Sequence, residues 1–153
     1  MYKNEIKGSL AWKRDNLTTN DWKVKLPDPV LDELHNFISF LRVNPTPLEV
    51  LEPRDFDLEA SYHFMQKIQN LIANGSGLAV VSKLPTEKFN KDELKQIYWI
   101  LSNLIARPVA QSFDGRLLYD VIDTGQKIGT RTRGDLTNQE LSWHTDYGFN
   151  FPP

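Results

Sequence analysis

The stretch Leu141-Ser142-Trp143-His144-Thr145-Asp146 decides how the rest of the sequence is interpreted. Side chains two residues apart on an extended chain point to the same face, so His144 and Asp146 would lie side by side. An imidazole nitrogen and a carboxylate oxygen can occupy adjacent positions on one divalent metal, and a non-haem Fe(II) centre that activates dioxygen uses two histidines and one carboxylate. The pattern therefore predicts a metal site, although a surface histidine and a solvated aspartate would give the same triplet.

The surrounding sequence resembles the first half of the taurine dioxygenase-like and clavaminate synthase-like oxygenases. The resemblance is carried by residues 120–125, residues 136–149 and the pair Pro152-Pro153. In that family a Tyr-Asp-Val strand, a Thr-Asn-x-x-Leu-x-x-His-Thr-Asp run and two following prolines occur in this order. The similarity covers about the last half of the chain and is looser before it.

This resemblance implies an Fe(II)- and 2-oxoglutarate-dependent dioxygenase. Fe(II) would be held by His144, Asp146 and one further histidine, with 2-oxoglutarate and dioxygen as co-substrates. The reaction would hydroxylate or desaturate a C–H bond of a small molecule while 2-oxoglutarate is decarboxylated to succinate. The carboxylate of Asp146 favours these outcomes over halogenation, because halogenating relatives have a small residue there. The family also places four residues around the pocket, each of which could equally face solvent or bond to the backbone: Gln111, Tyr119, Asn138 and Tyr147.

The expected fold class is α+β. Helix signals come first and strand signals later, which indicates a mixed fold in which helices pack on a β-sandwich. The resemblance implies a double-stranded β-helix, a jelly roll of the clavaminate synthase-like type, with N-terminal helices and incomplete in this chain. We expect one partial oxygenase domain with an arm over residues 1–26, a helical region with one core strand over 27–108, and a β region over 109–153 that ends in the metal motif.

Three helices are predicted from apolar residues at three- and four-residue spacing. The first spans residues 30–42, with Asp28 as its cap. The second spans residues 58–73, and the third begins at Asn90, which can form a capping box with Glu93. The residues predicted to face inward are Leu31, Leu34, Phe37, Ile38 and Leu41, then Leu58, Tyr62, Met65, Ile68, Leu71 and Ile72, then Leu94, Ile97, Tyr98, Leu101, Leu104 and Ile105.

The β-prone runs are short. Residues 78–82 predict a strand that is buried on both faces. The dipeptide Asp114-Gly115 separates the runs 109–113 and 117–122, which is typical of a hairpin. Residues 124–135 are polar and rich in glycine, and they predict a loop beside the site, without the spacing of a phosphate-binding loop.

Four large side chains outside these stripes have structural interpretations. Trp12 and Trp22 interrupt a polar arm, so we expect them to anchor the arm on the body of the protein. His35 lies beside the apolar face of the first helix, where a structural role is expected. His63 lies away from the stripe of the second helix, which predicts a solvated or capping side chain.

The composition is that of a globular protein of one domain, with 153 residues of which 40% are hydrophobic and 25% charged. The net charge of -2 provides no attraction to nucleic acid or to an anionic membrane. The absence of cysteine excludes a disulfide framework and a thiolate nucleophile. The N-terminus is charged where a secretory signal would be apolar, and no run is long enough to cross a bilayer. We therefore expect a cytoplasmic protein with a small-molecule substrate and no nucleic-acid or membrane partner.

The chain departs from the family pattern after the metal motif. Family members continue about as far again, and that part carries the third metal-binding histidine, the arginine that pairs with 2-oxoglutarate and the strands that close the sandwich. The other histidines of this chain, His35 and His63, match no ligand position. Three interpretations stay open: the chain is the N-terminal portion of an oxygenase, a second chain supplies the other half, or the chain is a non-catalytic remnant that acts as a binding or interaction module.

Overall fold

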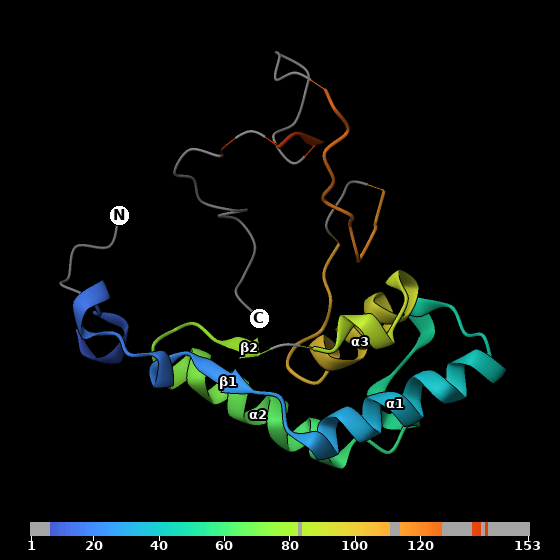
Figure 1. Cartoon of the computed structure of the whole chain (residues 1–153), viewed down its shortest axis with the longest axis horizontal. Helices are drawn as coiled ribbons and strands as arrows, with labels where there is room; N and C mark the ends of the chain where they lie inside the picture. The colour runs from blue at the N-terminus through green and yellow to red at the C-terminus, as the bar shows by residue number, and fades with distance from the viewer. Residues whose placement is uncertain (1–6, 83, 111–113, 127–135, 139, 141–153) are drawn as a thin grey trace. The chain divides into compact units, whose positions relative to one another are not determined.

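A computed structural model of the chain describes residues 7–82, 84–110, 114–126, 136–138 and 140. The chain forms two compact units, Met1–Arg107 and Pro108–Pro153. The α-helices and β-strands of the described residues all lie in the first unit (Figure 1). None of the helices in the described part of the chain combines the length and the hydropathy that a membrane span requires.

The first unit combines a helical core with a small parallel sheet. The helices are α1 (Asp28–Val43), α2 (Glu59–Asn74) and α3 (Lys91–Asn103), and the strands are β1 (Lys23–Lys25) and β2 (Val80–Ser82). Single-turn 3-10 helices fill the connections, namely η1 (Gly8–Leu10), η2 (Arg14–Asn16), η3 (Thr19–Asp21), η4 (Leu48–Val50), η5 (Pro53–Asp55) and η6 (Thr86–Lys88). The three helices predicted from apolar spacing are therefore confirmed.

The start of α1 differs from the prediction. The helix begins at Asp28, directly after Pro27, and Pro29 occupies its first turn, where the missing N–H of proline costs no hydrogen bond. The side chain of Asp28 makes no capping hydrogen bond, so the prediction that it caps α1 is wrong. Because Asp28 already belongs to the first turn, its carboxylate instead interacts with the positive end of the helix dipole. At the other end, the backbone and the side-chain amide of Asn44 both donate to Phe40 O.

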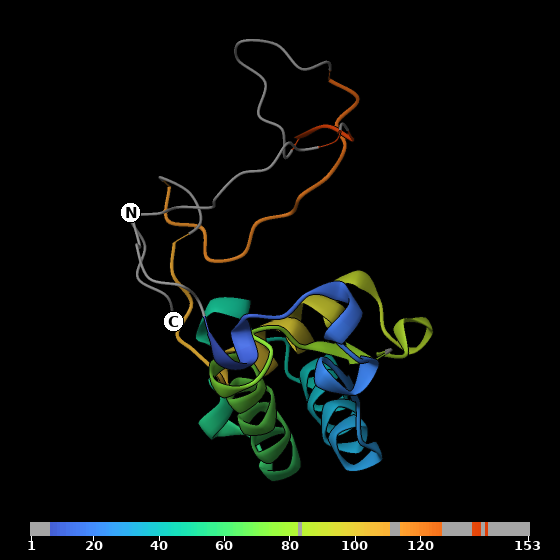
Figure 2. The same ribbon diagram turned by 90° about the vertical axis from the view of Figure 1, so that its left-hand side faces the viewer.

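The three helices enclose the hydrophobic core. α1 packs against α2 and α3, and α2 packs against α3; the first of these pairs is seen side by side in Figure 2. Each fully buried aliphatic or aromatic side chain in such a core contributes roughly 1.5–3 kcal/mol relative to an exposed one. The helical residues buried here are Val30, Leu34, Phe37, Ile38, Leu41, Phe64, Met65, Ile68, Ile97, Trp99 and Ile100.

Some of the predicted inward-facing residues lie on the outside. Tyr62 is 47% exposed, Ile72 is 43% exposed and Tyr98 is 62% exposed, so their assignment to the core is wrong. In α1 the buried stripe begins at Val30, and Leu31 is only half-buried. A helix turns by about 100° per residue, so a stripe that is assigned one residue late includes side chains from the flank of the helix.

Polar contacts explain why the residues buried on α2 and α3 differ from those predicted to be buried. Ser61, which is fully buried, accompanies Phe64 on the inner face of α2 because its hydroxyl has a carboxylate partner on α1. Trp99 is buried on α3 because its indole N–H donates to Leu51 O at 3.1 Å. A buried polar atom that finds a partner can occupy a position that an apolar count assigns to solvent.

The sheet joins two distant segments. β1 and β2 are parallel, with Lys23 opposite Val80, Val24 opposite Val81 and Lys25 opposite Ser82. The strand predicted at residues 78–82 is therefore present, but the prediction that it is buried on both faces is wrong, since its two valines are 48% and 38% exposed. Parallel strands become buried on both faces where helices cover both sides. In the described residues β2 has one partner strand, and its side chains remain open to solvent.

The N-terminal arm lies on the body of the first unit, as expected. Trp12 donates its indole N–H to Ser76 O at 2.7 Å, and Ser9 Oγ donates to Asn74 O at 3.1 Å. Trp22 is half-buried, and its carbonyl accepts from Val80 N at 2.7 Å. The role of Trp12 as an anchor is confirmed by its hydrogen bond to the segment that follows α2.

The second unit contains the segments on which the family resemblance rests. Its described residues are 108–110, 114–126, 136–138 and 140, and none of them belongs to a strand. The strand predicted over residues 117–122 is therefore not present. Gly115 has a positive φ of 82°, which suits the turn predicted at this dipeptide. A β-strand is stable only when a neighbour pairs with it, and residues 117–122 have no such neighbour among the described residues.

Candidate functional site

The predicted metal ligands lie outside the described residues. This holds for His144 and Asp146 and also for Gln111 and Tyr147. The metal site and the placement of these side chains therefore stay predictions. Among the described residues, no group of three or more histidine, cysteine, aspartate or glutamate side chains could hold a metal ion.

Two of the predicted pocket residues are described. Tyr119 is half-buried within the second unit, and Asn138 is exposed. Asn138 follows directly on Leu136 and Thr137, at the start of the run that leads to the metal motif. The exposure of Asn138 agrees with a side chain that faces solvent, and its place at the pocket stays a prediction.

A hydrogen-bonded junction connects the two segments that carry the family resemblance. Thr124 donates twice to Leu136 O, from its backbone N at 3.0 Å and from its hydroxyl at 2.9 Å. Asp123 precedes this junction, and its carboxylate accepts from Gly125 N at 2.8 Å. Residues 120–125 are thereby held against the start of residues 136–149. The junction closes the base of the predicted polar loop immediately before the chain runs on to His144.

Sequence reasoning missed this role of Thr124. A threonine at the entry to a polar, glycine-bearing segment is a familiar turn signal, because its hydroxyl can replace a backbone group in local hydrogen bonds. The partner, Leu136, is 12 residues away. No periodic sequence pattern specifies a contact across a loop of that length. Only the structure reveals the hydrogen bonds from Thr124 to Leu136.

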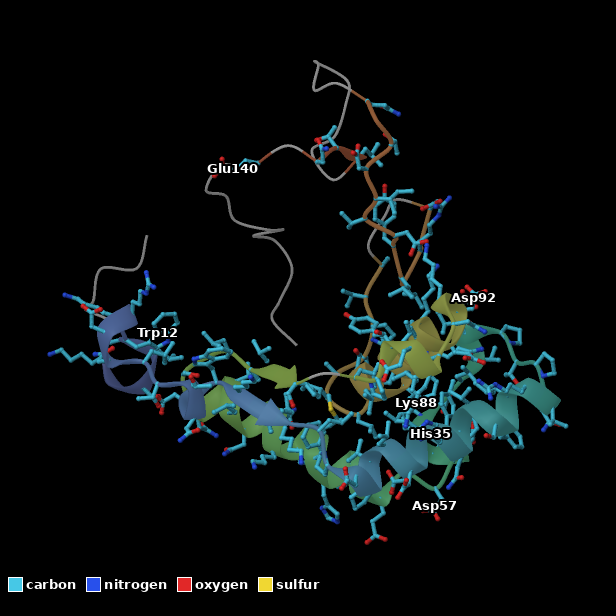
Figure 3. The ribbon with its side chains drawn as sticks, viewed as in Figure 1. Trp12, His35, Asp57, Lys88, Asp92 and Glu140 are labelled. Carbon is cyan, nitrogen blue, oxygen red and sulfur yellow. The ribbon has the colours of Figure 1, made fainter. Side chains whose placement is uncertain are left out.

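The two described histidines have local partners. His35 is half-buried and its ring lies 5.0 Å from the ring of Phe89. The side chain of His63 is 71% exposed, and its Nε2 lies 3.9 Å from a carboxylate oxygen of Glu59 one turn earlier. Figure 3 shows His35 on α1, away from the arm residue Trp12. The structural role expected for His35 and the solvated role expected for His63 are confirmed.

Two carboxylates of the first unit, one half-buried and one buried, connect its helices. Glu33 of α1 accepts three hydrogen bonds from the first turn of α2, from Ala60 N and Ser61 N at 2.7 Å each and from Ser61 Oγ at 2.6 Å. Glu93 of α3 accepts from Arg42 Nε at 2.8 Å and from Asn90 N at 2.9 Å. The hydrogen bond from Arg42 is the main reason that the pKa of Glu93 lies below its usual value. Both carboxylates hold helices together, and the buried Glu93 has a charged partner in Arg42.

Comparison with known proteins relates the chain to an enzyme. No protein-family model matches it. The chain is distantly similar to a synthase. This relative is FR-33289 synthase of Streptomyces rubellomurinus (strain ATCC 31215), which is 25% identical to the chain over 149 residues. The match covers 94% of this chain and 43% of the relative, so the chain spans less than half the length of the synthase that it resembles. The kinship with an enzyme thus extends over nearly the whole chain.

Proposed function

We propose that the chain is the N-terminal part of an Fe(II)- and 2-oxoglutarate-dependent oxygenase of the taurine dioxygenase-like and clavaminate synthase-like type. His144 and Asp146 supply two of the protein ligands to iron. The fold of the whole domain is a double-stranded β-helix with the helical unit at its N-terminal side. The third ligand, a histidine, and the arginine that binds 2-oxoglutarate come from a part of the domain that this chain does not include.

The observation that carries the proposal is the junction between Thr124 and Leu136. The two segments that resemble the oxygenase family are separated by residues 126–135, and the two hydrogen bonds at 3.0 and 2.9 Å hold their ends together. A chance resemblance gives no reason for these segments to meet. The distant similarity to a synthase over 94% of the chain supports an enzymatic role.

The donors fit the proposed metal by their chemistry. A neutral imidazole and a carboxylate, together with a second imidazole, form the ligand set that suits Fe(II) and leaves positions open for co-substrates. His35 and His63 belong to the helical unit and already have Phe89 and Glu59 as neighbours. The third ligand is therefore expected from elsewhere in the complete domain.

Bound iron would activate dioxygen with 2-oxoglutarate as the reductant, so that a C–H bond of a small molecule is hydroxylated or desaturated. The protein contributes orientation. Thr124 and Leu136 hold the segment that leads to His144, while Tyr119 and Asn138 provide a phenol and an amide that can bind polar groups of a substrate. The substrate is a small molecule, and the proposed compartment is the cytoplasm.

The proposal is tested on the full-length protein that contains this chain. Purified protein is reconstituted with Fe(II), and succinate formation from 2-oxoglutarate is measured for the parent, His144→Ala and Asp146→Ala. Replacing groups that merely support a metal ligand costs roughly 10–100-fold in affinity or activity, so loss of a ligand itself is expected to cost more than about 100-fold. Iron content, measured after removal of free metal, should fall in the same variants.

The matched control is His63→Ala, which removes an exposed histidine from α2 and should leave iron content and succinate formation unchanged. If parent protein neither retains iron nor consumes 2-oxoglutarate with both in excess, the oxygenase proposal is wrong and the non-catalytic binding module is favoured. Equal activity in the parent and in both ligand variants would also contradict the assignment of His144 and Asp146.

A further inference from the structure

A basic groove on the helical unit is lined by residues of β1 and α2. These two elements lie next to each other in Figure 1. Its volume is about 400 Å³, within the range of small-ligand sites. The polar side chains that line it are all cationic or amide-bearing, namely Lys23, Lys25, Lys67, Asn20, Asn70 and Asn74. No carboxylate is among the lining residues, so the groove has a single sign of charge.

Backbone geometry explains why these side chains converge. Lys23 and Lys25 are alternate residues of β1, and their side chains therefore point to one face of the strand. Lys67, Asn70 and Asn74 follow at three- and four-residue spacing on α2, which places them on one face of the helix. The groove forms where this face of α2 lies along β1.

Gly75 lines the groove directly after the last turn of α2. A Cβ atom added at this position would lie 2.5 Å from Leu71 O, so only glycine fits without displacing the last turn of α2. Leu71 supplies apolar surface beside the polar groups. A site of this kind combines apolar surface with a few convergent polar groups, which is the usual composition of a ligand pocket.

The cationic groups are not neutralised by the protein. In the described part of the chain, the ammonium groups of Lys23, Lys25 and Lys67 form no ion pair. Asn74 Nδ2 donates to Asn70 Oδ1 at 2.8 Å, which orients Asn70 and leaves its amide nitrogen as a donor. Three positive charges and an oriented donor are thus available to one ligand.

We propose that this groove binds the phosphoryl group of a small phosphorylated molecule. A phosphate ester carries about 1.5–2 negative charges at pH 7 and three acceptor oxygens, which matches several ammonium groups better than a single carboxylate does. The lysines act as point charges and the asparagine amides as hydrogen-bond donors. The residues that line the groove all belong to the first unit, and this inference does not depend on the oxygenase proposal.

The lysines have a second possible function, because cations also stabilise the negative end of a helix dipole. The two functions make different predictions. If the lysines only stabilise the helix, removing one lowers the stability of the fold, and the protein shows no saturable binding of phosphate. A binding role gives saturable binding that weakens with each lysine removed, while the fold is unchanged.

The test is a titration of the ¹⁵N-labelled 153-residue chain with glycerol 3-phosphate, inorganic phosphate, pyrophosphate and citrate at constant ionic strength, followed by amide chemical shifts. We expect saturable shifts confined to residues of η3, β1 and the second half of α2. Lys23→Gln and Lys67→Gln should each weaken binding about tenfold, as expected for one charge-assisted contact. Asn70→Asp, which adds a negative charge to the groove, should abolish it.

Lys88→Gln is the matched control, because Lys88 is an exposed lysine of η6 outside the groove, and it should bind as the parent does (Figure 3). Stronger binding of the ester than of inorganic phosphate identifies a phosphorylated metabolite as the ligand, and equal binding identifies the free anion. Unsaturable shifts up to millimolar phosphate, shifts that spread over the whole surface, or equal loss in Lys88→Gln would each overturn the proposal. Tighter binding of citrate than of every phosphate compound would overturn the phosphoryl assignment.

Discussion

The pair formed by Glu93 and Arg42 illustrates how single side chains hold this protein together. Glu93 is 8% exposed, yet it is an acidic residue in the first turn of α3. Its carboxylate accepts from Arg42 Nε at 2.8 Å and from Asn90 N at 2.9 Å. Both hydrogen bonds favour the ionised carboxylate and lower the pKa of Glu93, that from Arg42 the most. The hydrogen bond to Glu93 in turn raises the pKa of Arg42.

This pKa shift predicts a pH dependence of stability. A carboxyl group whose pKa is lower in the folded than in the unfolded state stabilises the fold at pH values above its ordinary pKa, and this contribution disappears as the pH falls through the folded pKa. Glu93→Gln keeps a side chain that can serve in the capping box but removes the charge. We expect a lower urea midpoint than that of the parent at pH 7 and a difference that shrinks on acidification below about pH 4.

The control for this prediction is Asp92→Asn, which removes an exposed charge from the same turn of α3. Its effect should be smaller than that of Glu93→Gln, because Asp92 has only the helix dipole to interact with in that turn. A stability difference for Glu93→Gln that is equally large at pH 7 and pH 3 would show that the ion pair with Arg42 is not its cause.

For single residues, the sequence predicted hydrogen bonds between neighbours in the chain but not those between distant residues. The capping box of Asn90 and Glu93 was predicted from their spacing and is present, with Asn90 Oδ1 accepting from Asp92 N and Glu93 N at 3.0 Å each. Arg42, the second partner of Glu93, is 51 residues away. The spacing of nearby residues determines a helix cap. An ion pair between two helices depends on how the helices pack, and no short stretch of sequence specifies that packing.

At the scale of the elements, α1 and α2 are joined through the N-terminus of α2. The first N–H groups of a helix have no partner within it and need an acceptor from outside. Leu58, the residue before α2, offers no side-chain acceptor, and the carboxylate of Glu33 on α1 takes this role with three hydrogen bonds of 2.6–2.7 Å. A cap that belongs to another helix fixes the crossing of the two helices as well as the start of α2.

Glu33→Ala is therefore expected to lower the free energy of unfolding by about 2 kcal/mol, because it removes a cap and leaves the buried hydroxyl of Ser61 without its acceptor. Urea unfolding followed by circular dichroism measures this change. Asp32→Ala, an exposed acidic residue on the same helix, is the control and should change stability by less than about 0.5 kcal/mol. Equal losses in the two variants would contradict the capping role of Glu33.

The elements differ in how well their sequence predicted them. Amphipathic spacing located α1, α2 and α3 to within a few residues, because a helix satisfies its own backbone hydrogen bonds. The strands depend on distant partners. β2 was located by its β-prone composition, but its exposure depends on how many strands and layers surround it, and residues 117–122 form no strand in the described part of the chain.

At the scale of the whole molecule, the chain divides between a helical unit and a unit that carries the oxygenase-like segments. The helical unit has a buried core and a basic groove of its own. The second unit contributes the junction of Thr124 with Leu136, which neither composition nor periodicity could predict. The nature of the proposed metal donors, by contrast, came from the sequence alone, because their residue types and spacing define the chemistry before any fold is known.

The central claim is that His144 and Asp146 bind one iron ion together. A crystal structure of the full-length protein with Fe(II), grown without oxygen and measured at the iron absorption edge, tests it most directly. The account predicts one anomalous peak with an imidazole nitrogen of His144 and a carboxylate oxygen of Asp146 both at roughly 2.0–2.2 Å, the usual distances for a divalent first-row metal. Two side chains that point to opposite faces of the chain, with no anomalous peak between them, would contradict it.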